Sequence, residues 1–354
     1  MQTSTQGVPR VPSIGNLPAG PRDSITDVPG VNVGHCTLAQ GDVQTGVTVI
    51  RPHEGDMYRD KVPAAATVLN GFGKSVGLVQ VDELGVLETP VALTNTFSVS
   101  AMAQAQIRAA VAANPEIGRA WPTVNPLVFE CNDGYLNDIQ RMAVDGSHYD
   151  AALAAAGQEV AQGAIGAGRG MSSFGVKGGI GTASRMAQGY CVGALVLANF
   201  GTPESLTLAG KLVGPQLVQR LVQPGAMAQP PLPEKGSIIM VVATDAPLDA
   251  RQLRRLSLRA GAGLARTGSV FGHGSGDIAL AFSTAYTVPH QADRAMPAVA
   301  MLHETLLDPL FRAAADSVEQ AIVHALWHAA TVQGRDGHAR RALLEVMPEL
   351  RQSA

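Results

Sequence analysis

The sequence predicts an α/β protein in which β-sheets are layered between α-helices. Short apolar runs bounded by glycine or proline, such as residues 191–199 and 238–243, are typical of buried strands. The segment 309–330 places apolar residues at i, i+4 spacing, which is typical of a helix with one buried face. Strand and helix patterns alternate along the C-terminal part of the chain, as they do in layered α/β folds.

The N-terminal half begins with an arm, residues 1–24, that is polar, rich in proline and expected to be irregular. From residue 25 to the C-terminus we expect one domain. Alternating or continuous apolar residues predict strands at 25–35, 47–50, 65–69 and 91–93. The first periodic helix is expected at 98–113, where Ser98 or Ser100 can cap it and Asn114 with Pro115 ends it.

The second half continues the alternation. The expected elements are a strand at 126–131, a turn at 132–135, a helix at 151–160, a glycine-rich run at 163–182 and a strand at 191–199. A strand at 238–243, a helix at 249–265 capped by Asp249, a strand at 277–283 and a helix at 309–330 follow. No segment repeats internally.

Composition excludes several classes of partner. With 354 residues, 46% of them hydrophobic, the chain can bury a large core. Its net charge is −3 and no lysine/arginine run exceeds two residues, so nucleic acid is not an expected partner. The apolar runs are far shorter than the roughly 20 residues that span a bilayer, so no membrane partner is expected.

The cysteines indicate a reducing compartment. Cys36, Cys131 and Cys191 are odd in number and form no CxxC pair, unlike a disulfide framework. Together with an N-terminus that has no apolar signal core, they predict a cytoplasmic protein, with the periplasm as the open alternative.

No cofactor or metal is expected. Gly166 and Gly168 are followed by Met171 where a dinucleotide motif has its third glycine, and Val68 stands where a phosphate loop before Gly73 would begin with glycine. His324 and His328 have an i, i+4 spacing, but no HExxH motif accompanies them. We expect these histidines to face solvent or a neighbouring subunit.

The border between Gly236 and Ser237 is an informative candidate for chemistry. A stretch with four prolines, 223–235, ends there, and the buried strand 238–243 begins directly afterwards. Cleavage at this bond would leave Ser237 with a free α-amine beside its own hydroxyl. That is the arrangement of an N-terminal nucleophile whose amine acts as its base.

Two other interpretations compete with this one. A Gly-Ser pair before a strand is common turn chemistry. Ser275 also follows a glycine and precedes a strand, and it has a carboxylate, Asp277, two residues along on the same strand face. No GxSxG elbow is present for a conventional Ser-His-Asp triad. From the residues alone, Ser237 and Ser275 are nearly equal candidates.

From residue 25 onward the chain resembles the P1 family of self-processing serine aminopeptidases, which includes the L-aminopeptidase/D-amidase-esterase and the β-peptidyl aminopeptidases. The resemblance extends over nearly the whole chain, in the family's order. It is carried by ITDVPGVNVGH at 25–35, NDGYLND at 132–138, GALVLANFG at 193–201, GSII at 236–239, ATDAPL at 243–248 and GSGDI at 274–278.

The resemblance implies a four-layer αββα sandwich similar to the N-terminal-nucleophile fold. It also implies self-cleavage before Ser237 into an α chain, 1–236, and a β chain, 237–354, with four αβ units usually forming a tetramer. Tyr135 and Asn199 match the residues that stabilise the oxyanion, and Glu130 matches an acidic residue near the substrate's free amine. Ser275 matches a second serine that activates the nucleophile. Asp277 stands where some relatives have glutamate.

These residue types suit the implied reaction. A phenol and a carboxamide are neutral donors to an oxyanion, and a carboxylate attracts a free ammonium group. The expected activity is removal of N-terminal residues from small peptides, amides or esters. The rivals are an acyltransferase of the same fold, which uses a threonine nucleophile, a linear-amide hydrolase, and an uncleaved binding or scaffold protein.

Overall fold

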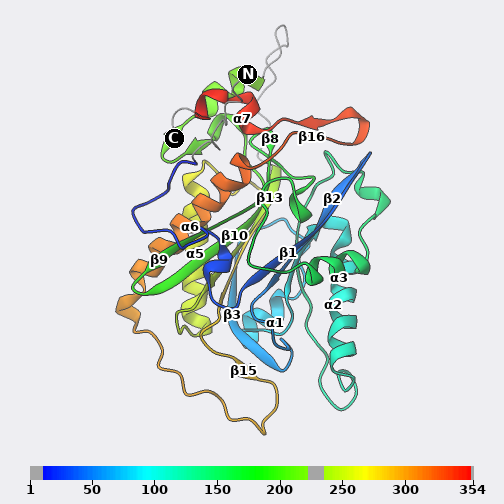
Figure 1. Ribbon diagram of the computed structural model, residues 1–354, viewed down its shortest axis with the longest axis vertical. Helices are drawn as coiled ribbons and strands as arrows, with labels where there is room; N and C mark the ends of the chain where they lie inside the picture. The colour runs from blue at the N-terminus through cyan, green and yellow to red at the C-terminus, as the bar shows by residue number, and fades with distance from the viewer. Residues whose placement is uncertain (1–10, 222–234, 352–354) are drawn as a thin grey trace, which may run out of the picture.

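Two β-sheets lie face to face between two layers of helices (Figure 1). The computed structural model of the chain describes residues 11–221 and 235–351. Helices α2 and α3 cover one sheet, and α5 and α6 cover the other. The chain therefore has the expected four-layer αββα architecture. None of the helices in the described ranges is long and apolar enough to cross a membrane.

The first sheet has four strands in the order β1-β2-β5-β6. Its strands are β1 (Asn32–Gln40), β2 (Val43–Arg51), β5 (Val91–Asn95) and β6 (Leu127–Cys131). Only the β5–β6 pair is parallel. This sheet carries Glu130 at the end of β6, next to Cys131.

The second sheet has the order β15-β3-β14-β13-β10-β9, and β4 also pairs with β3. Its strands are β3 (Asp60–Gly71), β4 (Val86–Leu87), β9 (Gly179–Ala187), β10 (Tyr190–Asn199), β13 (Lys235–Thr244), β14 (Gly274–Ser283) and β15 (Val288–Pro289). β13 and β14 are parallel, and helix α5 connects them as parallel strands require. β10 runs antiparallel to β13 on its other side.

The helices are α1 (Leu78–Leu84), α2 (Val99–Ala113), α3 (Gly146–Ala154), α4 (Gly214–Leu221), α5 (Ala250–Arg266), α6 (Asp308–Trp327) and α7 (Leu343–Val346). Asp249 caps α5 as expected, and its carboxylate accepts from the Gln252 N–H at 2.7 Å. Three short hairpins complete the described strands: β7 (Ser172–Ser173) with β8 (Val176–Lys177), β11 (Thr207–Leu208) with β12 (Lys211–Leu212), and β16 (Val332–Gln333) with β17 (Ala339–Arg340).

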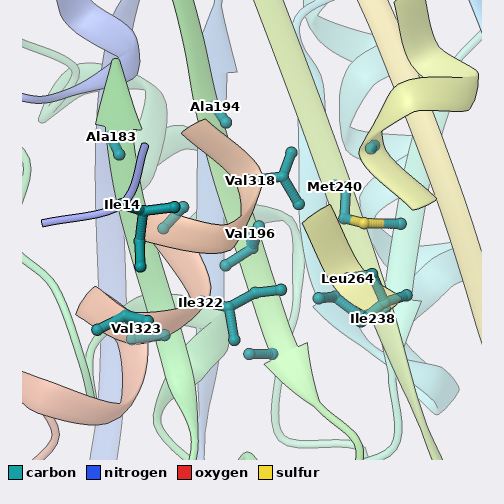
Figure 2. Close-up of a cluster of buried hydrophobic side chains, with 14 of the residues drawn as sticks. Ile14, Ala183, Ala194, Val196, Ile238, Met240, Leu264, Val318, Ile322 and Val323 are labelled. Carbon is teal, nitrogen blue, oxygen red and sulfur yellow. The ribbon is translucent and has the colours of Figure 1, made fainter. Parts of the chain in front are cut away.

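The core has two main layers because side chains alternate across β13 and β10. Ile238 and Met240 belong to the cluster between the second sheet and helices α5 and α6, where Figure 2 shows them near Leu264 and Val318. Ile239 and Val241 belong instead to the cluster between the two sheets. The position before Ile238, which is Ser237, therefore shares the inter-sheet face.

Local sequence signals placed two elements incorrectly. The segment predicted as a strand from residue 25 starts as a short 3-10 helix, Ile25–Asp27, because Ser24 and Asp27 form a capping box. β1 begins only at Asn32. The helix predicted at 151–160 is instead α3, Gly146–Ala154, which starts at the Asp145 cap.

Two further predictions concern the arm and the linker. Residues 11–24 contain no helix or strand, and residues 1–10 lie outside the described ranges. The proline-rich stretch before Ser237 falls almost entirely at 222–234, which also lies outside the described residues.

Candidate active site

Ser237 lies near the start of β13, between two strands that supply its neighbours. It pairs with Asn199 at the end of β10 and with Gly276 on β14. Only 5% of Ser237 is exposed. Strand pairing thus places Asn199, 38 positions before Ser237, and Gly276, 39 positions after it, on either side of the candidate nucleophile.

The Ser237 hydroxyl contacts the peptide bond that would be cut. Its Oγ donates to the Gly236 carbonyl oxygen at 2.7 Å and accepts from the Gly276 N–H at 3.2 Å. The hydroxyl is therefore held beside the Gly236 carbonyl group, within the same two residues that an N-to-O acyl shift would involve.

Gly236 has a backbone that favours glycine. Its φ is +147°, and a Cβ built there would lie 2.1 Å from the Asn199 carbonyl oxygen. Since that oxygen belongs to the neighbouring strand, the contact cannot be relieved by a side-chain rotation. The residue before Ser237 is thus restricted by its surroundings to glycine.

The Asn199 carboxamide is buried and has a defined orientation. Its Oδ1 accepts from the Ser172 N–H at 2.9 Å, which identifies the other terminal atom as nitrogen. That Nδ2 donates to the Asn132 carbonyl oxygen at 3.1 Å. An amide nitrogen carries two hydrogens, so Asn199 can hold this bond and still donate to a second acceptor.

Tyr135 lies in the turn that follows Asn132. Tyr135 is 38% exposed and is not a core residue. His338 stacks on it with ring centroids 4.6 Å apart, and the Arg340 guanidinium lies 3.6 Å from the ring centroid. Asn199 donates to the Asn132 carbonyl in this turn, so Tyr135 lies three residues from a contact of Asn199. His338 and Arg340, from the C-terminal hairpin, pack on the Tyr135 ring.

Glu130 is a buried carboxylate with two ordered donors. Oε1 accepts from the Lys74 N–H at 2.8 Å, and Oε2 accepts from the Thr96 hydroxyl. A Cβ built on Gly73 would lie 3.6 Å from Oε1 and 3.8 Å from the Gly276 Cα. Gly73 therefore places Glu130 close to the strand that borders Ser237, on its β14 side.

Ser275 and Asp277 form a buried pair. The Ser275 hydroxyl donates to Asp277 Oδ1 at 2.5 Å. The register pairs Ser275 with Gly236 and Asp277 with Ile238, and Ile238 packs toward α5 and α6. Alternation thus directs these two side chains to the opposite face of the sheet from the Ser237 hydroxyl.

Lys177 is a buried cation that sequence reasoning missed. Its ammonium donates to the carbonyl oxygens of Gly168, Met171 and Gly178 at 2.7–3.0 Å. Burial lowers its pKa well below the usual value. Because these carbonyls belong to the glycine-rich loop that also contains Ser172, Lys177 supports the backbone that orients Asn199.

Asp133 is a second buried charge next to the same turn. Burial raises its pKa to about 6, although hydrogen bonds from Thr45, Asn137 and Asn95 oppose this shift. The Asn137 Nδ2 donates to Asp133 Oδ1 at 3.0 Å. An Asn-Asp-Gly sequence signals a turn, and nothing in that pattern distinguishes a buried aspartate from a solvated one.

The histidine pair of α6 does not match its expected placement. His324 is buried and its Nδ1 lies 2.7 Å from the Thr182 carbonyl oxygen, so it faces β9 and not solvent. His328 is exposed. Across residues 11–221 and 235–351, no group of three or more His, Cys, Asp or Glu is arranged to hold a metal ion.

Comparison with known proteins gives consistent matches over nearly the whole chain. The model of peptidase family S58 matches residues 23–340. The chain is similar to the beta-peptidyl aminopeptidase BapA of Sphingosinicella xenopeptidilytica, with 38% identity over 338 residues, which is 89% of this chain and 83% of that protein.

Two solved structures share the architecture. A Burkholderia sp. beta-aminopeptidase has a TM-score of 0.86 and 40% identity, and covers 96% of this chain and 97% of its own. The L-aminopeptidase D-Ala-esterase/amidase from Ochrobactrum anthropi, described as a variant of the Ntn hydrolase fold, has a TM-score of 0.86 and 34% identity, with coverages of 97% and 96%.

Proposed function

The chain belongs to peptidase family S58 and is a serine aminopeptidase/amidase, and we propose that it activates itself by cutting the Gly236–Ser237 bond. The observation that carries this proposal is the 2.7 Å hydrogen bond between the Ser237 hydroxyl and the Gly236 carbonyl oxygen. The products are an α chain, 1–236, and a β chain, 237–354.

The proposed cleavage is an N-to-O acyl shift. Ser237 Oγ attacks the Gly236 carbonyl carbon, the C–N bond breaks as the C–O bond forms, and the hydroxyl proton passes to the departing nitrogen. Water then hydrolyses the resulting ester. Gly236 gains a C-terminal carboxylate, and Ser237 regains its hydroxyl and gains a free α-amine.

Peptide or amide turnover follows the same bond changes in trans. The Ser237 α-amine takes the hydroxyl proton while Oγ attacks the substrate carbonyl. The proton then passes to the leaving amine, and water hydrolyses the acyl-enzyme. We place Ser275 and Asp277 at the α-amine. Ser275 is in register with Gly236 and Asp277 with Ile238, so the two residues flank the Ser237 backbone nitrogen, and the carboxylate orients the Ser275 hydroxyl.

We assign oxyanion stabilisation to Asn199 and Tyr135. One amide hydrogen of Asn199 is used by the Asn132 carbonyl, which leaves the other for the developing charge. The Tyr135 phenol is a second neutral donor beside the same turn. Each such donor is typically worth about 3–4 kcal/mol of the barrier.

We assign the substrate ammonium to Glu130. An ionised carboxylate has about four lone-pair positions. Lys74 and Thr96 use two of them, which leaves acceptors for an amine. A substrate bound in this way presents its first peptide bond to Ser237, so the enzyme removes N-terminal residues from small peptides, amides or esters.

We also propose a cytoplasmic tetramer of αβ units. All three cysteines are free thiols, which supports a reducing compartment. Exposed apolar side chains on two helices, Val79 and Leu84 on α1 with Ile107 and Val111 on α2, supply surface suited to burial between copies. Light scattering on the processed protein tests the tetramer.

Intact mass and N-terminal sequencing of the purified protein test the self-cleavage. We expect two chains, with the smaller one starting at Ser237, and a single full-length inactive chain for Ser237→Ala. A new terminus at Ser275 would transfer the nucleophile to that residue. A processed or active Ser237→Ala protein would refute the assignment, and an uncleaved wild-type chain without turnover would support a binding protein.

A further inference from the structure

The C-terminal hairpin β16–β17 packs against the turn that carries Tyr135. Arg335 donates from its backbone N–H to the Leu136 carbonyl oxygen at 2.8 Å and from Nε to the Gly134 carbonyl oxygen at 2.7 Å. His338 Nδ1 lies 2.9 Å from the Tyr135 carbonyl oxygen. Figure 1 shows this hairpin beside β8, and the Lys177 N–H donates to the Arg341 carbonyl oxygen there. The hairpin is therefore a fixed part of the site.

Arg340 places a cation over the Tyr135 ring. Its guanidinium carbon is 3.6 Å from the ring centroid, a distance typical of planar stacking, for which arginine is better suited than lysine. Burial lowers the Arg340 pKa, and the electrostatic interaction with Tyr135 partly raises it. The guanidinium stays charged at neutral pH and has lost part of its hydration.

This cation has hydrogen-bonding capacity that the described residues leave unused. Its Nε is buried without a partner, and Nη1 donates to the Ala339 carbonyl oxygen at 3.4 Å, a long hydrogen bond. Within residues 11–221 and 235–351, no carboxylate forms an ion pair with it, whereas Arg335 on the same hairpin is paired with Asp336. A partly dehydrated guanidinium with free donors favours a planar anion such as a carboxylate.

Arg340 and Glu130 approach Ser237 from opposite sides. Glu130 lies on the β14 side, because its Oε1 is near Gly73 and Gly73 is near Gly276. Tyr135 and Arg340 lie on the β10 side. Asn199, at the end of β10, donates to the Asn132 carbonyl in the turn that carries Tyr135, and Arg340 stacks on Tyr135. Because β13 lies between β14 and β10, these two flanking strands are two strand spacings, or about 10 Å, apart. An extended chain of two or three residues spans about 7–10 Å.

We infer that Arg340 binds the C-terminal carboxylate of the substrate, so that this enzyme prefers dipeptides and tripeptides with a free C-terminus. The inference rests on the proposed function, because it takes Ser237 as the nucleophile and Glu130 as the ammonium site. Glu130 and Arg340 then recognise the two ends of a zwitterionic peptide, and the scissile carbonyl lies between them.

The test compares free dipeptides with their C-terminal amides. The probes are β-Ala-Ala and Ala-Ala, each as the free acid and as the amide, so the comparison does not depend on α- or β-residue preference. We expect the wild type to prefer the free acid by roughly tenfold or more in kcat/KM, mainly through KM. Arg340→Gln should lower kcat/KM for the free acid far more than for the amide and so remove most of that preference, and Arg340→Lys should retain part of it.

The control is Arg341→Gln, which removes the same charge from an exposed neighbouring side chain and leaves the stack intact. It should keep the wild-type preference. Cleavage into two chains reports folding of each variant, and Arg340→Lys serves as the main variant if Arg340→Gln is not processed.

Two results overturn this inference but not the proposed function. The first is equal kcat/KM of the wild type for free acids and amides. The second is an equal fall in kcat/KM for both substrates in Arg340→Gln, which would mean that Arg340 only positions Tyr135. A processed wild type that cleaves none of the four probes, nor aminoacyl p-nitroanilides, overturns the proposed function as well.

Discussion

The Asn199 carbonyl oxygen occupies the space that a side chain on Gly236 would need. A Cβ at that position would lie 2.1 Å from this oxygen and 2.9 Å from the Phe200 Cα, and the Gly236 backbone already has a φ of +147°. The end of β10 thus determines which residue can precede the nucleophile, and the same residue, Asn199, provides the proposed oxyanion donor.

Gly236→Ala should slow self-cleavage by roughly tenfold or more, because the added methyl group must displace backbone and the scissile bond with it. The measurement is the half-life of the full-length chain by denaturing electrophoresis. Gly41→Ala is the control, since Gly41 also has a positive φ, +55°, but has open space around it. Processing of Gly236→Ala at the wild-type rate would contradict the prediction.

Asn199→Ala should lower kcat by roughly 10²-fold or more in processed protein, because it removes a donor that acts on the oxyanion. Asn199→Asp should be similarly slow, since it retains the acceptor for the Ser172 N–H but has no donor. Steady-state kinetics on an aminoacyl p-nitroanilide provide the measurement. An unchanged kcat would return Asn199 to a purely structural role.

Hydrolysis should require a free substrate amine. The wild type should cleave an aminoacyl p-nitroanilide but not its N-acetyl counterpart, because acetylation removes the charge that Glu130 attracts. Glu130→Gln should lower kcat/KM for the free amine by roughly 10- to 100-fold. Glu159→Gln, at a side chain that is 94% exposed, is the matched control. Equal turnover of both substrates by the wild type would identify a general or endo-acting amidase.

Asp133 should make the folded chain lose stability as the pH rises through about 6. Burial raises its pKa from 3.8 to about 6, so the folded state binds this proton more tightly than the unfolded state does. The protonated Asp133 thus contributes on the order of 3 kcal/mol to the free energy of unfolding. This contribution is fully present below pH 3.8 and is lost as the pH rises through 6.

Urea unfolding between pH 4.5 and 7.5, in the uncleaved Ser237→Ala background, measures this effect. Asp133→Asn should gain free energy of unfolding relative to its parent as the pH rises, because an amide does not ionise. Asp138→Asn, at a partly exposed carboxylate nearby, should not show this gain. Parallel pH curves for Asp133→Asn and its parent would contradict the assignment of the shift.

Strand and cap signals in the sequence were sufficient for much of the fold. The apolar run 238–243 lies within β13, and Asp249 caps α5 as predicted. Both depend on residues within a few positions of one another, so local chemistry decides them. The Gly236–Ser237 border also rests on local signals, but Ser275 satisfies nearly the same local criteria. The resemblance to the family motifs favours Ser237, and this assignment stays a prediction.

Contacts between distant segments were decided only by the tertiary structure. Strand register determines that Ser237 pairs with Asn199 and that Ser275 pairs with Gly236, and a shift of one residue would exchange the faces of these side chains. The stack of Arg340 on Tyr135 joins residues 205 positions apart. By itself the sequence determined which residues have the required chemistry, whereas sheet pairing and hairpin docking decided which of them meet, because both depend on packing of the whole chain.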